Sequence, residues 1–161
     1  MGSFTSRFAH LTATVCGIGH APAMPGTWAS AAALPVAWGL QALGGVPLLA
    51  LATVFAFALG LWASGVVLRD ARVENPGIKD PGWIVIDEVA AQWLVLLVVP
   101  LDVNLYAIAF VLFRIADVWK PWPASWADRM LVGSAGVMVD DIFAAAWAAV
   151  ALIVFRYAWF I

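Results

Sequence analysis

The chain is poor in charged residues, in cysteine and in histidine. Charged residues make up 11% of its 161 positions, whereas about a quarter of a soluble globular domain is charged. The single cysteine, Cys16, excludes an internal disulfide, a cysteine-ligated zinc site and an iron–sulfur cluster. The net charge of −2 gives no sign of nucleic-acid binding.

What the chain has in excess is apolar residues. They make up 65% of the sequence, against about 45–50% in a soluble domain. This length and composition predict one integral membrane domain over residues 1–161. We expect an all-α fold, a polytopic membrane helical bundle with four to five spans plus short interfacial or re-entrant helices.

Five segments approach the length of about 20 apolar residues that a membrane span needs. A turn at Gly44-Gly45 separates the first two, and Pro47 suits the first position of a helix. Residues 4–16 are expected to form an interfacial or re-entrant helix, and residues 121–130 either a helix in the membrane plane or an anchoring loop. The predicted spans cover approximately residues 28–43, 47–68, 83–100, 105–119 and 135–160.

The positions of lysine and arginine set the expected orientation, because cytoplasmic loops carry an excess of these residues. With the N-terminus in the cytoplasm, Arg156 alone lies towards the opposite side. The opposite orientation would reverse this bias, so we expect a cytoplasmic N-terminus. The basic residues then expected on the cytoplasmic side are Arg7, Arg69, Arg72, Lys79, Lys120 and Arg129.

Six acidic residues stand at the edges of these spans, where ionisable groups are costly and are usually kept for a function. The predicted topology brings them to one cytoplasmic depth, at the starts of the third and fifth spans and at the end of the fourth. Together with Arg114 and Lys120, they suggest a one-sided site for a divalent cation and a phosphate group. The six residues are Asp87, Glu88, Asp117, Asp128, Asp140 and Asp141.

Each of these groups also has a structural explanation. Acids in a first helical turn, such as Asp87 and Glu88, compensate the helix dipole. Adjacent helical positions point about 100° apart, so we expect these two not to face one point equally well. Arg114 could form an internal ion pair, and Lys120 could extend towards lipid headgroups. We favour a functional interpretation because the charged groups come from three different spans.

A glycine-rich loop over residues 17–27 precedes the first span. Thr27 is expected to cap the following helix, and an anion could bind at that helix N-terminus. A plain turn is the alternative for this loop. His20 is a minor candidate, with a structural or solvent-facing histidine as its alternative.

Several phosphatase chemistries are excluded by the sequence. No arginine follows Cys16 at the Cys-x5-Arg spacing, a histidine nucleophile with a histidine acid–base needs more than His10 and His20, and no Asp-x-Asp pair is present. What remains is Mg²⁺ held by carboxylates, which would polarise the phosphoryl group. Whether water or an aspartate attacks phosphorus stays open.

Five motifs follow one another over about residues 17–145: Gly17-x-Gly-x-x-Pro-x-x-Pro-Gly-Thr27, Ile86-Asp-Glu88 with Gln92, Phe113-Arg-Ile-x-Asp-x-x-Lys-Pro-Trp-Pro123, Asp128-Arg129, and Gly136-Val-Met-x-Asp-Asp-Ile142. In this order they resemble the phosphatidylglycerophosphatase A family. The resemblance implies a bacterial inner-membrane, Mg²⁺-dependent lipid phosphatase that converts phosphatidylglycerophosphate into phosphatidylglycerol and inorganic phosphate. Ala29, Ala91 and Ala145 stand where glycine is expected in that family, and these are packing positions.

The residues and the resemblance therefore lead to one expectation, a multi-pass inner-membrane protein that acts on a phospholipid from the cytoplasmic side. The expected metal ligands are Asp87, Glu88, Asp140 and Asp141. The expected catalytic residues are Asp87, Asp117 and Asp141, and the expected phosphate-binding residues are Arg114, Lys120 and Thr27.

Two other classes of membrane protein compete with this expectation. A CDP-alcohol phosphotransferase also uses aspartate-bound metal, but its motif is absent from the sequence. A transporter would need polar residues that continue through the bilayer, whereas the second predicted span is almost wholly apolar.

Overall fold

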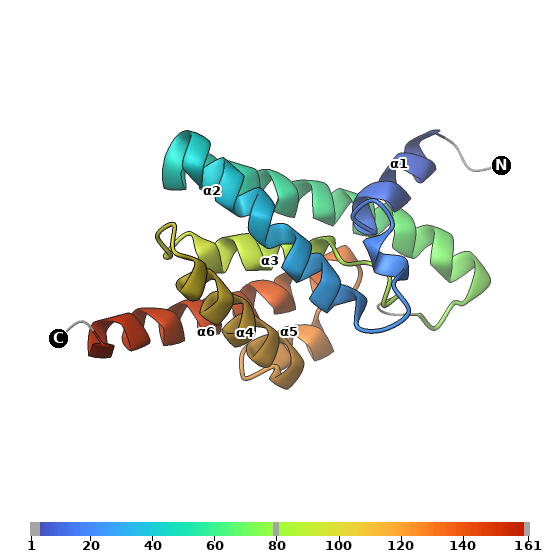
Figure 1. The fold of residues 1–161 in the computed structure, drawn as a ribbon. Helices are drawn as coiled ribbons and strands as arrows, with labels where there is room; N and C mark the ends of the chain where they lie inside the picture. The colour runs from blue at the N-terminus through green and yellow to red at the C-terminus, as the bar shows by residue number, and fades with distance from the viewer. Residues whose placement is uncertain (1–3, 79–80, 160–161) are drawn as a thin grey trace.

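A computed structural model describes residues 4–78 and 81–159, and every regular element in these ranges is a helix (Figure 1). The all-α prediction is therefore confirmed for the described residues. Lys79 and the last predicted position of the fifth span, Phe160, lie outside them. The elements are α1 (Phe4–Ala13), the 3-10 turn η1 (Ile18–His20), α2 (Pro25–Glu74), α3 (Ile86–Leu96), α4 (Val103–Trp119), α5 (Ala124–Met130) and α6 (Ser134–Trp159).

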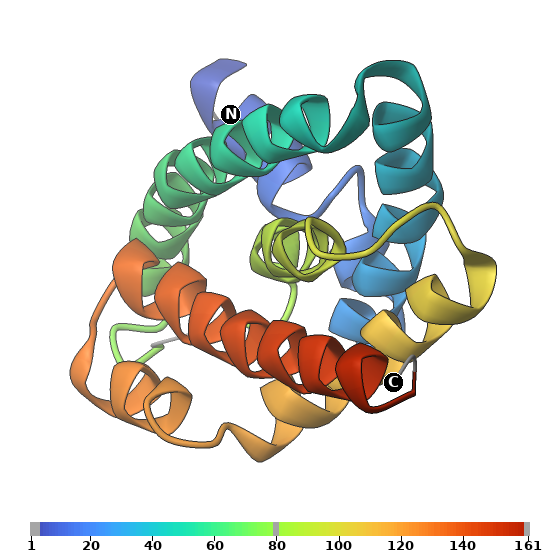
Figure 2. The same ribbon diagram turned by 90° about the vertical axis from the view of Figure 1, so that its left-hand side faces the viewer.

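Helix α2 consists of two halves joined at a sharp bend, which Figure 2 shows clearly. Gly45 has φ 67° and ψ −166°, a backbone conformation open essentially to glycine alone. The turn predicted at Gly44-Gly45 is thus present, as a break within one long element. The first half begins at Pro25 and the second ends at Glu74, so both are longer than the sequence predicted.

Helix α3 runs through the middle of the bundle, with α2, α4 and α6 around it (Figure 2). Most of its residues are buried, as expected for a short helix that is apolar on nearly all sides. Its 11 residues measure only about 16 Å, less than the roughly 30 Å of a bilayer core. The prediction of a helical span over residues 83–100 is wrong in length, because the chain leaves the helix for turns before Ile86 and after Leu96.

Two described helices are long and apolar enough to cross a membrane, Pro25–Val73 and Ser134–Ala158. The first of these contains both halves of α2. Helix α4, with 17 residues, is just at the lower limit of about 17. The count of four to five spans accordingly stays a prediction.

The two short helices that the sequence suggested are both present. Helix α1 packs against α2, and Ser6 and His10 on α1 contact the carboxylate of Asp70 on α2 at 2.6 Å and 3.2 Å. Helix α5 packs against α6 and follows Pro123. Residues 124–130 are therefore helical, and the position of this helix in the membrane plane stays a prediction.

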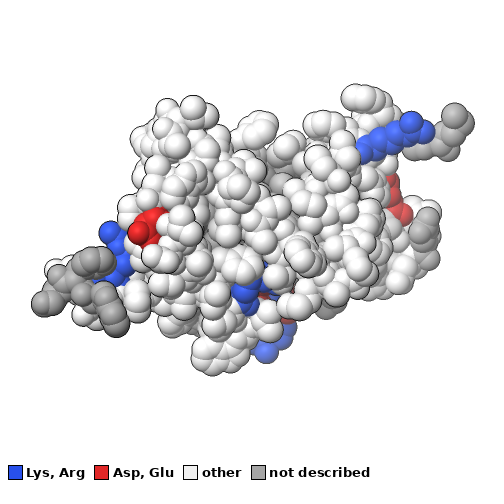
Figure 3. All heavy atoms as spheres, in the orientation of Figure 1, with Lys and Arg blue, Asp and Glu red and all other residues white. Residues whose placement is uncertain are grey.

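Charged side chains are sparse on the molecular surface. Figure 3 shows them at the two ends of the long axis and in one patch on the lower edge, with a broad uncharged face between. Many large apolar side chains on the helices are exposed, including Leu51, Phe55 and Val154. Such a surface suits an apolar solvent better than water.

Candidate active site

Three carboxylates from two helices meet beside α3. Carboxylate oxygens of Asp87, Glu88 and Asp141 all lie within 4.8 Å of one another. Asp87 and Glu88 belong to the first turn of α3, and Asp141 lies in the second turn of α6. Both neighbours on α3 therefore contribute a carboxylate oxygen to one cluster, although adjacent helical positions point in different directions.

The adjacent residues Asp140 and Asp141 on α6 make different contacts. Asp141 joins the carboxylate cluster, whereas the Nζ of Lys120 donates a hydrogen bond to the carboxylate of Asp140. Lys120 also donates to Asp128 at 3.0 Å. Asp140 lies outside the three-carboxylate cluster: one of its oxygens accepts from this lysine, the other has no hydrogen-bond partner among the described residues, and its role as a fourth metal ligand stays a prediction.

Lys120 ends α4 in a left-handed conformation with φ 46°, and this turn directs the chain towards α5. Burial lowers the pKa of Lys120, but its hydrogen bonds to Asp140 and Asp128 outweigh that effect and raise the pKa above its usual range. The ammonium group therefore stays charged at neutral pH.

Arg114 lines the same cavity as Lys120. One of its terminal nitrogens donates to Asp117 at 2.8 Å and to the hydroxyl of Ser30 at 3.5 Å. Asp117 and Asp141 line the same cavity. The ion pair with Asp117 thus holds the arginine in that cavity, as the spacing of three residues on α4 allows.

The start of α2 lies against the cluster at unusually close range. A Cβ built on Gly26 would fall 1.9 Å from Oε1 of Glu88, so only glycine permits this approach. The helix is preceded by Met24 in a left-handed conformation, with no side-chain cap. The prediction that Thr27 caps the helix is therefore wrong, because the helix begins at Pro25, two residues earlier.

The cluster opens into a cavity of about 340 Å³ at the junction of α2, α3, α4 and α6. Thr27 does not line it, and His20 is exposed on η1 and does not line it either. The predicted residues that line the cavity are Asp87, Glu88, Arg114, Asp117, Lys120, Asp140 and Asp141.

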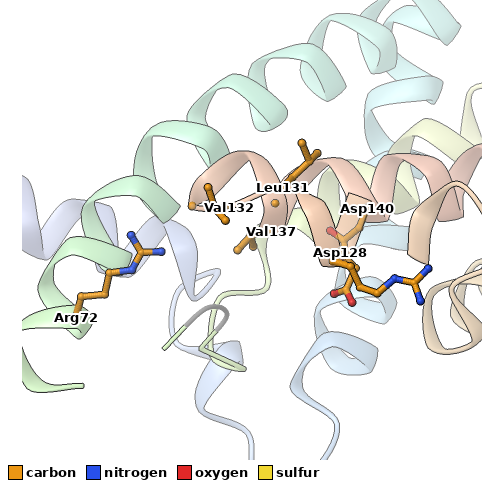
Figure 4. A pocket seen from close by; sticks show the side chains of 9 residues that line it. Arg72, Asp128, Leu131, Val132, Val137 and Asp140 are labelled. Atoms are coloured by element: carbon orange, nitrogen blue, oxygen red, sulfur yellow. The ribbon is translucent and has the colours of Figure 1, made fainter. Parts of the chain in front are cut away.

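A second cavity, of about 230 Å³, adjoins the first through Asp140. Figure 4 shows Arg72 on α2 at one side of it, with Asp128 and Asp140 at the other. Arg129 also lines this space. The predicted residues Asp128 and Arg129 thus lie beside the carboxylate cavity and not in it.

The donor set fits a hard divalent cation. The grouped side chains offer only carboxylate oxygens, which are the ligands that Mg²⁺ and Ca²⁺ prefer. Like charges this close repel one another. Glu88, Asp140 and Asp141 each have a buried oxygen with no hydrogen-bond donor among the described residues. Such oxygens are costly to bury unless a cation or water occupies the space beside them.

Two contributors to the site were not found by the sequence reasoning, Gly26 and Ser30. Gly26 belongs to the glycine-rich loop, for which the sequence suggested an anion site and not a contact with Glu88. Ser30 donates to the carbonyl of Gly26 at 2.9 Å and accepts from Arg114. The sequence signal that could have identified Ser30 is its position one helical turn after Gly26.

Comparisons with known proteins identify the family of the chain. A family model described as Phosphatidylglycerophosphatase A matches residues 11–156. A protein of Escherichia coli named phosphatidylglycerophosphatase A is 38% identical over 136 residues, which is 84% of this chain and 76% of the relative. A protein of the same name from Haemophilus influenzae is 34% identical over 149 residues, or 92% of this chain and 88% of the relative. No solved structure matches the chain significantly.

Proposed function

Because the chain belongs to the phosphatidylglycerophosphatase A family, and is therefore a phosphatase, we propose that it removes the terminal phosphate of phosphatidylglycerophosphate in a Mg²⁺-dependent reaction. The products are phosphatidylglycerol and inorganic phosphate. The observation that carries this proposal is the cluster of Asp87, Glu88 and Asp141 in a cavity that also contains Arg114 and Lys120. Acidic groups for a cation and basic groups for a phosphate thus share one space.

The carboxylates of Asp87, Glu88 and Asp141 are the residues that would hold Mg²⁺, with Asp140 as a further candidate. The ion would supply Lewis-acid polarisation of the phosphoryl oxygens. Lys120 donates to both Asp140 and Asp128, which hold it at the cavity wall, and one of its three N–H donors remains for a phosphate oxygen.

Arg114 and Lys120 would both bind the phosphate. A guanidinium offers five N–H donors, and its contacts to Asp117 and Ser30 use only one of its terminal nitrogens. Asp117 fixes the arginine by its ion pair and is also the candidate base. Hydrolysis forms a bond from the attacking oxygen to phosphorus, breaks the bond to the glycerol oxygen, and returns a proton to that oxygen.

We further propose that the protein lies in the bacterial inner membrane as a multi-pass protein, with the site on the cytoplasmic side. The two halves of α2, together with α4 and α6, give four candidate crossings, and the central α3 with its flanking turns would be the fifth. A phosphomonoester at the headgroup level would then meet the site. The excess of lysine and arginine on that side supports the orientation.

Phosphate release from purified protein in detergent tests the function. The substrates are phosphatidylglycerophosphate and two other lipid phosphomonoesters with different headgroups, each assayed with Mg²⁺ and with a chelator. We expect release from phosphatidylglycerophosphate that depends on Mg²⁺. Equal phosphate release with Mg²⁺ and with chelator would contradict the proposed Mg²⁺ dependence. Phosphate release from one of the other lipids, but not from phosphatidylglycerophosphate, would contradict the proposed substrate.

A further inference from the structure

We infer that one acyl chain of the lipid substrate lies in an apolar groove between the start of α2 and the end of α4, an inference that rests on the proposed function. The groove has a volume of about 630 Å³. It is lined by Met24, Thr27, Phe110, Val111, Arg114, Ile115, Val118 and Trp119. Helices α2 and α4 lie side by side here (Figure 2).

The groove is continuous with the carboxylate cavity. Met24, Arg114 and Val118 line both spaces. A molecule with a phosphate at one end and a hydrocarbon chain at the other could therefore occupy both at once. A second apolar groove, lined in part by Pro121 and Trp147, shares Ile115 and Trp119 with the first groove but no residue with the carboxylate cavity.

Two buried hydrogen-bonding atoms lie near the boundary between the two spaces, one on Arg114, which lines both, and one on Thr27, which lines only the groove. The hydroxyl of Thr27 and the Nε of Arg114 have no hydrogen-bond partner within the described part of the chain. Unsatisfied buried donors are costly, and an oxygen of the ligand between its chain and its phosphate could accept from them. Thr27 would then contact the substrate as predicted, but at this boundary and not as a helix cap.

Beyond this boundary the lining offers almost nothing except hydrocarbon. Val111, Ile115 and Val118 are 51%, 55% and 73% exposed, and they follow one another along one side of α4. Such a strip has no group that would recognise a polar headgroup, whereas an acyl chain gains free energy for each methylene that it buries. When the acyl chain lies in the groove, the phosphate end of the ligand reaches the carboxylate cavity, which also contains Arg114 and Lys120.

The test fills the groove without touching the site. Val111→Trp places a bulky ring in the groove, and Val150→Trp on α6 is the matched control. Both valines are about half exposed, at 51% and 54%, and Val150 lines neither apolar groove. Each variant and the unaltered protein are assayed on a lipid phosphomonoester with long acyl chains and on a water-soluble analogue with short chains.

We expect Val111→Trp to lower kcat/KM for the long-chain substrate by about tenfold, because the chain loses a few buried methylenes. The short-chain substrate should be hydrolysed at nearly the normal rate, and Val150→Trp should leave both unchanged. Equal activity of the two variants on the long-chain substrate would overturn the inference. An equal loss on both substrates would also overturn it, since that result indicates damage to the site itself.

The same assay separates this inference from the proposed function. If the unaltered protein releases no phosphate from any lipid phosphomonoester, the proposed function fails, and the inference fails with it. If the unaltered protein is active and Val111→Trp behaves as Val150→Trp does, the inference alone fails.

Discussion

The two ends of the bundle use polar side chains in opposite ways. At the end with the Gly45 bend, the amide of Gln41 donates to the carbonyl of Val99 at 2.8 Å and accepts from the hydroxyl of Tyr106 at 2.7 Å. At the carboxylate end, buried oxygens of Glu88 and Asp141 lack donors among the described residues. The side chains of Gln41 and Tyr106 are satisfied by the protein, whereas the unpaired oxygens of Glu88 and Asp141 are available for a ligand.

The comparison extends to aspartates in the two regions. Asp102 begins α4 and accepts a hydrogen bond from the backbone N–H of Leu105 at 2.9 Å, which is ordinary helix capping. Asp141 lies inside α6, is 4% exposed and faces other carboxylates. An acid with a structural partner needs no further explanation, but one buried among like charges does.

The largest effect is expected from exchanging an aspartate at each end. Asp141→Asn should lower phosphate release by more than about 100-fold, since even outer partners of metal ligands cost about 10–100-fold. Asp102→Asn is the matched control, because asparagine caps a helix as well as aspartate does. The exchange at Asp102 should leave turnover unchanged. Near-normal turnover of Asp141→Asn would remove Asp141 from the site.

A second variant tests the close approach at Gly26. Gly26→Ala would bring a methyl group against Glu88, and a displacement of that carboxylate should cost about 100-fold in kcat/KM. Gly39→Ala is the control within the same helix, because a Cβ there meets nothing within 4 Å. Steady-state kinetics on both variants would measure the difference. If the two variants were equally active, Glu88 would not need its observed position.

The lysine at the cavity wall should have a smaller effect. Lys120→Met removes a charged donor from the phosphate and from Asp140, for which we expect a loss of about 10–100-fold in kcat/KM. Lys120→Arg keeps the charge and should recover part of the activity. Activity of Lys120→Met equal to that of the unaltered protein would exclude the lysine from phosphate binding.

The smallest expected effect lies at the opposite end. Tyr106→Phe removes the hydrogen bond to Gln41 and should lower the free energy of unfolding by about 1 kcal/mol. Thermal unfolding in detergent measures this change, and kcat/KM should stay the same. A large loss of activity with unchanged stability would show that the hydrogen bond between Tyr106 and Gln41 affects the carboxylate site at the other end of the bundle.

Much of the fold could be predicted from the sequence, because helix ends have local signals. The break at Gly44-Gly45 and the end of α4 before Pro121 are both local features of the sequence. The length of α3 could not be predicted from hydropathy, since residues 83–85 and 97–99 are apolar but lie outside the helix. Their burial depends on α1 and α2, as when the N–H of Val85 donates to the carbonyl of Ala13 at 2.8 Å.

The sequence predicted most of the residues that line the carboxylate cavity, although Thr27 lies outside it, but it did not predict how these residues pair. Helical spacing on α4 suggested the ion pair of Arg114 and Asp117, which is present at 2.8 Å. The separation of Asp140 from Asp141 depends on where Lys120 lies, and no local pattern encodes that position. The fit of Gly26 against Glu88 is likewise a contact between distant segments of the chain.

Titration of the purified protein with Mg²⁺, followed by thermal unfolding, tests the central claim most directly. The three carboxylates repel one another until a cation binds, so Mg²⁺ should raise the Tm of the unaltered protein and of Asp102→Asn. Asp141→Asn should show little or no such rise. A Tm that rises equally in all three proteins, or in none of them, would contradict a metal site at Asp87, Glu88 and Asp141.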